Sequence, residues 1–122
     1  MKYFQQAIEM DSTSASANYN IGVLYYNLSK YEEALKYLQR ALEMYQALYK
    51  GNHPDIADTW YALGALYYNL SKYEEALKYY QQALEMRKTL YPDNHPDIDL
   101  TRVELYFTTL RIKWQQSKCI IS

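Results

Sequence analysis

Residues 25–44 read YYNLSKYEEALKYLQRALEM, and residues 67–86 read YYNLSKYEEALKYYQQALEM. Eighteen of these 20 positions are identical, and the second copy follows the first at an offset of 42 residues. The same offset carries the segment His53-Pro54-Asp55-Ile56 onto His95-Pro96-Asp97-Ile98. Self-similarity at a period of this length is typical of a protein built from stacked structural repeats.

Apolar residues within each copy recur every three or four positions, which is the spacing of one face of an α-helix. One predicted stripe consists of Ile21, Leu24, Tyr25 and Leu28, and its copy of Leu63, Leu66, Tyr67 and Leu70. A second stripe consists of Leu35, Leu38, Leu42 and Tyr45, and its copy of Leu77, Tyr80 and Ala83. Short polar breaks at 27–30 and 69–72 separate the two helices of each pair, and longer breaks lie at 50–54 and 92–96. The sequence therefore predicts antiparallel helix hairpins.

The second copy also carries a recognisable motif. Its residues fit the spacing W-x₂-L-G-x₂-Y…A-x₃-F…A, with Trp60, Leu63, Gly64, Tyr67, Ala76, Tyr80 and Ala83. This pattern resembles the tetratricopeptide repeat, and the 42-residue period with its Asn-His-Pro-Asp linker resembles the long-repeat subclass of kinesin light chains. The resemblance covers residues 2 to about 99. It implies an all-α fold, a right-handed α-solenoid of antiparallel helix hairpins with about six helices.

We expect residues 1–122 to form a single domain. Its predicted parts are a half repeat with only the second helix (1–12), repeat 1 (13–52), repeat 2 (53–94) and a degenerate C-terminal helix or cap (95–122). In the last part Arg102 stands in the Trp position and Tyr106 in the Gly position, and the pattern lapses after Thr109.

The resemblance also implies that the first helix of each pair lines a concave groove. The predicted groove residues are Tyr19, Asn20, Val23, Tyr26 and Asn27 in repeat 1, Tyr61, Ala65, Tyr68 and Asn69 in repeat 2, and Phe107, with Val103 and Leu110, in the last part. We expect a nearly uncharged, tyrosine-rich trough in which aromatic anchors and Asn amides hold a peptide segment. Relatives that bind the acidic tails of chaperones use Lys, Asn and Arg in the groove, whereas this chain has Tyr19, Val23, Ala62, Leu100 and Glu104 there.

The two histidines, His53 and His95, each lie in a His-Pro-Asp triplet. A zinc site would lack further Cys or His ligands at suitable spacing. The J-domain cochaperones also use this triplet, but only once, whereas here it recurs with the repeat, so we interpret it as a structural turn. The sequence has neither a Gly-rich phosphate loop nor a nucleophile with a paired base nearby. We therefore expect no enzyme activity, no cofactor and no metal.

Charge and composition narrow the partner to a protein. The net charge of −1 lacks the basic excess of a nucleic-acid-binding protein. No stretch approaches the roughly 20 apolar residues of a membrane span. The single cysteine, Cys119, and the absence of an apolar leader favour the cytoplasm. We predict a non-catalytic adaptor; the alternative is a self-assembly module whose incomplete terminal repeats stack as a homo-oligomer, burying Phe4 and the region of Trp114.

Overall fold

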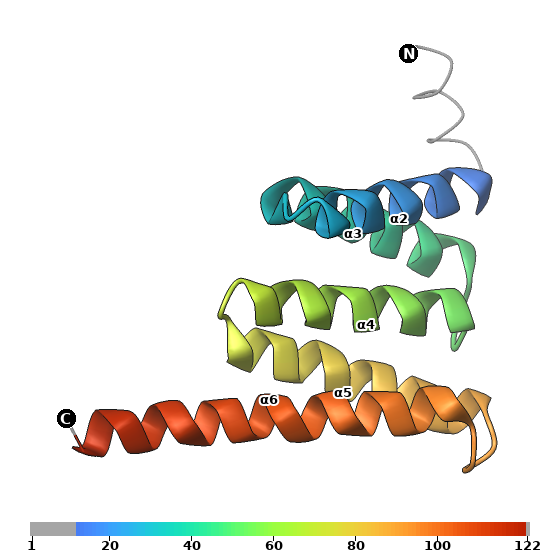
Figure 1. Cartoon of the computed structure of the whole chain (residues 1–122). Helices are drawn as coiled ribbons and strands as arrows, with labels where there is room; N and C mark the ends of the chain where they lie inside the picture. Colours follow the sequence, from blue (N-terminus) through green and yellow to red (C-terminus); the bar gives the residue numbers. More distant parts are fainter. Residues whose placement is uncertain (1–11, 122) are drawn as a thin grey trace.

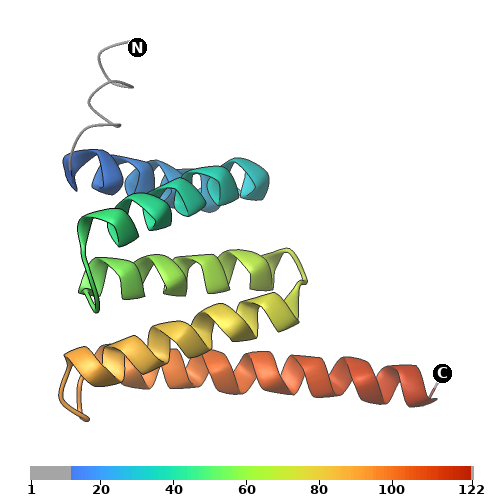
Figure 2. The same ribbon diagram turned by 180° about the vertical axis from the view of Figure 1, so that it is seen from behind.

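A computed structural model describes residues 12–121 of the chain, which form five α-helices and no strand (Figure 1). The helices are α2 (Ser12–Asn27), α3 (Tyr31–Leu48), α4 (Pro54–Asn69), α5 (Tyr73–Leu90) and α6 (Pro96–Ile121). They stack one after another, with α2, α4 and α6 nearer the viewer in Figure 1 and with α3 and α5 in front in the reverse view of Figure 2. The fold is thus an all-α solenoid of antiparallel helix hairpins. The predicted half repeat falls on residues 1–12, of which 1–11 lie outside the described residues.

The turn inside each hairpin is closed by a serine in the left-handed conformation. Ser29 has a φ of 60° and Ser71 a φ of 61°. The backbone N–H of Ser29 donates to the carbonyl of Tyr26 (2.9 Å), and that of Lys30 donates to the carbonyl of Tyr25 (2.9 Å). The same two bonds recur 42 residues later. This pattern is the Schellman motif, which satisfies the last carbonyls of a helix, and it confirms the predicted breaks.

The turns between hairpins are closed by the two histidines. His53 Nδ1 accepts a hydrogen bond from the backbone N–H of Asp55 (3.0 Å), and His95 Nδ1 accepts one from that of Asp97 (3.1 Å). A side chain that accepts from this position satisfies one of the free N–H groups at a helix start. The ring of Tyr49 stacks on that of His53, with centroids 3.5 Å apart. The structural role expected for both triplets is confirmed.

The two glycines at the centre of the hairpins let a side chain of the facing helix pack directly against their backbone. A Cβ added to Gly22 would lie 2.7 Å from Cγ of Leu38, and one added to Gly64 would lie 2.8 Å from the ring of Tyr80. Distances that short are inside van der Waals contact, so any side chain here would push the helices apart. The glycines therefore set how closely each first helix packs on its second.

One predicted apolar stripe is only half correct. Leu66 is fully buried, but its equivalent Leu24 is 57% exposed, and so is Leu28. Leu66 belongs to an apolar cluster with Ala34 and Leu38 of the preceding α3. In the described part of the chain no helix precedes α2 to cover Leu24 in this way. The stripe is real, but its burial depends on a neighbouring hairpin.

Helix α6 continues well past the point where the repeat pattern lapses. It runs for 26 residues, compared with 16 for α2 and α4, and its end extends beyond the rest of the stack in Figure 1. No Pro or Gly follows Thr109 in this helix, so nothing in the sequence stops it. Its exposed large apolar residues are Leu100, Val103, Tyr106, Phe107, Leu110 and Trp114.

Candidate functional site

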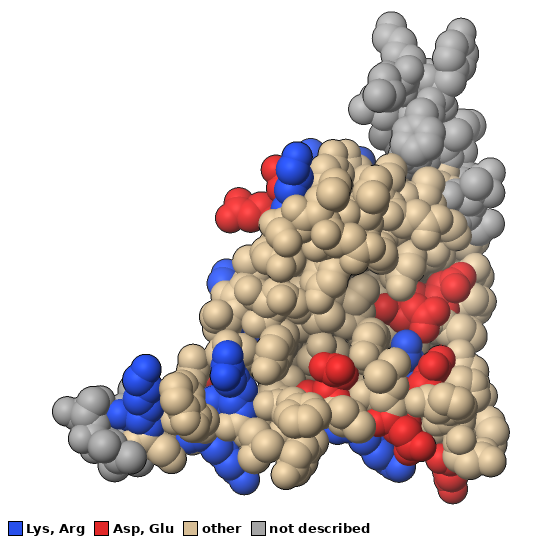
Figure 3. Space-filling view, viewed as in Figure 1, with Lys and Arg blue, Asp and Glu red and all other residues tan. Residues whose placement is uncertain are grey.

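A hollow of about 380 Å³ lies between the first helices of successive hairpins, α2, α4 and α6. We call it the tyrosine hollow. The predicted groove residues that line it are Tyr19, Val23, Tyr26, Asn27, Tyr61, Ala65, Tyr68 and Asn69. Ala62 and Glu104, which the resemblance to chaperone-binding relatives had placed at groove positions, also line it. Two residues that were not predicted complete it: Leu38 of α3 and Tyr80 of α5. In Figure 3 the middle of the stack is largely uncharged, and basic groups gather over the C-terminal half of α6.

Four predicted groove residues do not line the hollow: Asn20, Val103, Phe107 and Leu110. Asn20 is exposed on α2. Phe107 is 53% exposed, lies one turn beyond Glu104 on α6 and contacts the ring edge of Tyr106, with centroids 5.7 Å apart. The described chain has no further helix that would place Phe107 in a groove. Val103 and Leu110 are likewise exposed on α6.

The inner wall is tied together by one asparagine. Nδ2 of Asn69 donates to the hydroxyl of Tyr26 (2.7 Å) and to the carbonyl of Ala65 (2.8 Å). The first of these bonds crosses from α4 to α2. Both N–H groups of the amide are therefore used inside the protein, and the side-chain carbonyl is the group that remains to accept a bond from a ligand. Of the bonds predicted between Asn amides and a peptide, Asn69 can therefore supply only the one that its side-chain carbonyl accepts.

The floor of the hollow comes from the second helices. Leu38 and Tyr80 are each 1% exposed, and each packs against the glycine of its own hairpin. The ring of Tyr80 meets that of Tyr61 edge to face, with centroids 5.4 Å apart and an angle of 62°. Such pairs hold aromatic rings in defined orientations. The floor is therefore rigid, while the rings of the wall reach the surface.

Glu104 is the charged residue among those that line the hollow. The other lining residues are uncharged, in line with the expected nearly uncharged trough. Burial raises the pKa of Tyr61 to about 12, and the negative charge of Glu104 adds to this effect while Arg87 opposes it. Burial and then Glu104 also raise the pKa of Tyr80. These phenols stay protonated at neutral pH, so they offer neutral rings and hydroxyl groups.

Arg87 holds the base of the site together. Its side chain is nearly buried and donates through Nη2 to Asp58 Oδ1 (2.9 Å) and through Nη1 to Thr101 Oγ1 (2.8 Å). Its guanidinium also lies over the ring of Tyr61, 4.8 Å from the centroid. One side chain of α5 thus fixes α4 and α6 relative to each other, which keeps Tyr61 and Glu104 at a set distance.

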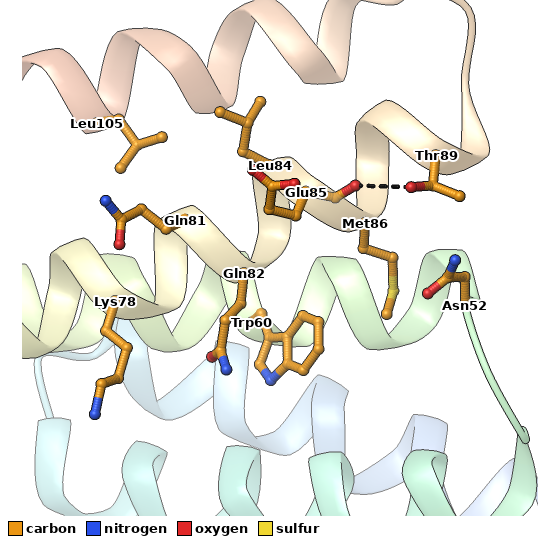
Figure 4. A pocket seen from close by; sticks show the side chains of 10 residues that line it. All are labelled: Asn52, Trp60, Lys78, Gln81, Gln82, Leu84, Glu85, Met86, Thr89 and Leu105. Atoms are coloured by element: carbon orange, nitrogen blue, oxygen red, sulfur yellow. Dashed lines mark hydrogen bonds between the residues drawn. The ribbon is translucent and has the colours of Figure 1, made fainter.

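A second hollow, of about 680 Å³, is wider but less suited to recognition. Figure 4 shows its lining, which comes mainly from α5 with Trp60 of α4 and Leu105 of α6. Six of the ten lining residues are exposed and polar: Asn52, Lys78, Gln81, Gln82, Glu85 and Thr89. Ordering long exposed side chains around a ligand costs conformational entropy. The tyrosine hollow, with its buried floor, is the better candidate site.

The described part of the chain offers neither a metal site nor a membrane span. Among residues 12–121 no group of three or more His, Cys, Asp or Glu is placed to hold a metal ion. Over the same range, no helix combines the length and the apolar character needed to cross a bilayer.

Comparison with known proteins agrees with this fold. Residues 13–89, more than half of the chain, match the family model described as tetratricopeptide repeat. No curated protein sequence gives a significant match.

Solved structures with the same architecture include BtubC (BKLC) from P. vanneervenii. It is 22% identical with a TM-score of 0.80, and the match covers 97% of this chain and 51% of that one. A Podosopora anserina protein assigned as a kinesin light chain with nearly identical TPR-like repeats is 16% identical with a TM-score of 0.69, covering 92% of this chain and 55% of that one. This chain therefore spans about half the length of the structures it matches. At these identities the likeness establishes the fold alone.

Proposed function

This chain belongs to the tetratricopeptide repeat family, and from that premise we propose that it is a non-catalytic adaptor that holds a segment of a partner protein in the tyrosine hollow. Repeats of this family generally serve protein–protein interaction rather than catalysis. A cytoplasmic location, and the absence of nucleic-acid partners, remain predictions from the sequence.

The arrangement of aromatic side chains carries this proposal. Tyr19, Tyr26, Tyr61 and Tyr68 line one hollow from two successive repeats, above a floor that is almost fully buried. Tyrosine supplies a large contact area while losing little side-chain entropy, and binding energy concentrates at such anchors. The volume lies in the range of roughly 300–1,000 Å³ that is usual for ligand sites. A side chain or two of an extended or helical segment fits such a space.

The test is an affinity capture with matched variants. We would immobilise the wild-type chain, the double variant Tyr26→Glu/Tyr68→Glu and a control, Tyr37→Glu, whose ring stacks on Tyr25 away from the hollow. Circular dichroism would first establish that all three are equally helical. We expect a protein from the native lysate to be retained by the wild type and by the control, and to be lost from the double variant. Equal retention by all three would contradict the proposal.

Self-assembly is the second candidate, and one observation favours it. Tyr106 is 62% exposed and Trp114 is 56% exposed on the same helix, which leaves a large apolar surface on α6. Exposed apolar patches often mark protein interfaces. If this face joins two copies, light scattering after gel filtration will give a dimer for the wild type and a monomer for Tyr106→Ser/Trp114→Ser. The hollow variant Tyr26→Glu/Tyr68→Glu would then remain a dimer. A monomeric wild type at high concentration would exclude this alternative.

A further inference from the structure

We propose that the tyrosine hollow accepts a cationic side chain, a lysine or an arginine, from the bound protein segment, with Glu104 as its counter-charge and the tyrosine rings as its walls. This inference rests on the proposed function, because it names the chemistry of the segment that the hollow would hold.

The first argument is the position of Glu104 among the rings. It lines the hollow together with Tyr26, Tyr61 and Tyr68 of the wall and Tyr80 of the floor. Its negative charge acts on the hydroxyl groups of Tyr26, Tyr61 and Tyr80, so the carboxylate lies within electrostatic range of all three. A cation placed over the face of an aromatic ring is attracted by the ring's quadrupole, and more strongly where water is excluded. Carboxylate and rings thus attract the same kind of group.

The second argument is that the charge of Glu104 is not balanced inside the protein. None of the ion pairs formed among residues 12–121 includes Glu104. The arginines nearest in the fold have other contacts: Arg87 pairs with Asp58, and Arg102 lies 3.7 Å from Asp99. Arg111 donates to the hydroxyl of Tyr73 (3.2 Å). The hollow therefore presents one net negative charge to whatever enters it.

The third argument is that the repeat itself does not require this carboxylate. At the offset of 42, Glu104 occupies the position held by Asn20 and Ala62 in the earlier repeats. Neither of those residues is charged, and both earlier helices form without one. Glu104 lies in the middle of α6, away from its N-terminus, so it is not placed to stabilise the helix dipole. Its charge is a feature of the hollow rather than of the scaffold.

The protein already contains the proposed interaction once. The guanidinium of Arg87 lies 4.8 Å from the centroid of Tyr61 and is paired with the carboxylate of Asp58 at 2.9 Å. At the hydroxyl group of Tyr61 the negative charge of Glu104 has a larger effect on the pKa than the opposing positive charge of Arg87, so the balance there still favours a second cation. A lysine or arginine from the partner would combine a tyrosine ring and a carboxylate in the same way. An acidic side chain would instead be repelled by Glu104.

The experiment is a selection from a displayed library of random peptides, with sequencing of the retained pool. The baits would be the wild type, Glu104→Gln, the variant Tyr26→Ser/Tyr68→Ser, which removes both rings without adding charge, and Glu43→Gln. This last variant removes the same charge from the exposed surface of α3. We expect the wild-type pool to be enriched in Lys or Arg at one position, and the enrichment to be unchanged with Glu43→Gln and lost with Glu104→Gln. Glu104→Lys should reverse the preference toward Asp or Glu.

A titration then measures the effect directly. A selected synthetic peptide and its copy with Gln in place of the enriched Lys or Arg would be titrated into wild type and Glu104→Gln. We expect the cationic peptide to bind roughly 5- to 30-fold more tightly than its copy to the wild type, and the difference to vanish in the variant. Peptides retained through Tyr26 and Tyr68 without such enrichment, or with one that Glu104→Gln leaves intact, would overturn this inference alone. Retention that does not depend on Tyr26 and Tyr68 would overturn the proposed function itself.

Discussion

The two hairpins place different chemistry at the same point of the repeat. In the first, Ser16 Oγ and Tyr45 Oη share a hydrogen bond of 3.1 Å between α2 and α3. Exactly the same positions 42 residues later hold Asp58 and Arg87, which form an ion pair of 2.9 Å between α4 and α5. The scaffold accepts both because Ser16 and Asp58 lie at the rim, where water still solvates one partner of each pair.

This difference sets how each hairpin meets the next helix. Tyr45 belongs to an apolar cluster with Ile56 and Ala57 of α4. Arg87 instead donates a hydrogen bond to Thr101 of α6. The shared residues of the repeat therefore fix the geometry of a hairpin, whereas this one variable position decides whether the contact with the following helix is apolar or polar.

The largest effect should come from removing the polar contact that Arg87 makes with Asp58 and Thr101. Arg87→Met leaves Asp58 without its ion-pair partner, whereas Thr101 keeps its bond to the carbonyl of Asp97 (2.6 Å). We expect this change to cost about 2 to 3 kcal/mol, less than for a fully buried pair because the side chain of Asp58 is 42% exposed. The matched change in the first hairpin, Tyr45→Phe, removes only one neutral hydrogen bond and should cost about 0.5–1.5 kcal/mol. Urea unfolding followed by circular dichroism measures both. Equal costs for the two variants would show that the positions are interchangeable after all.

A smaller effect is expected at the glycine contacts. Gly64→Ala drives a methyl group into the ring of Tyr80, which Tyr61 holds in place. We expect a net loss of about 1–2 kcal/mol, because overpacking outweighs the gain in helix propensity. Gly22→Ala should cost less, since the side chain of Leu38 can change rotamer where a ring cannot. Thermal unfolding of both variants tests this order, and a stabilised Gly64→Ala would refute the close contact.

The third difference between the hairpins is a buried tyrosine in place of a leucine, and it affects stability only at alkaline pH. Burial raises the pKa of Tyr61 to about 12, above the ordinary value of 10.0 that applies to the unfolded chain. The stabilisation linked to the protonated phenol is complete below pH about 10 and is lost as the pH rises through the folded pKa. Tyr80 acts in the same direction, whereas its equivalent Leu38 does not titrate. We therefore expect the free energy of unfolding of Tyr80→Leu to fall less than that of the wild type between pH about 10 and about 12, each compared with its own value at neutral pH. A greater loss of stability in Tyr80→Leu than in the wild type would contradict this prediction.

Much of the fold could be predicted because the same helical pattern occurs twice in the sequence. The offset of 42 and the helical spacing predicted both hairpins and their turns, and these are local properties of the chain. The exposure of Leu24 could not be predicted in this way, since it depends on what packs against α2. The sequence predicted a degenerate helix or cap over 95–122 and left the structure of its last residues open; α6 spans Pro96–Ile121, because loss of a repeat motif is not a signal that stops a helix.

The candidate site, too, could be predicted from the sequence only in part. Its wall could be predicted because the resemblance to the tetratricopeptide repeat carries the family's groove positions onto the first helix of each hairpin. Its floor was missed because Leu38 and Tyr80 read as ordinary core residues, and only the contact with each glycine brings them beneath the wall. Ala62 and Glu104 were placed in the groove from the sequence, but only as departures from the chaperone-binding relatives, and the charge of Glu104 was not counted in the expected character of the trough. Whether these residues bind a partner stays a proposal.

The bond from Asn69 to Tyr26 has a mechanical consequence. It spans two successive hairpins at the edge of the hollow, and the hollow itself extends from α2 to α6. Separating the two hairpins would lengthen this bond, because its donor lies on α4 and its acceptor on α2. A segment seated across the hollow would act as a crosslink, so the stack should be stiffer with its ligand than without it. Tension along the repeat and occupancy of the site would then both depend on the distance between α2 and α4.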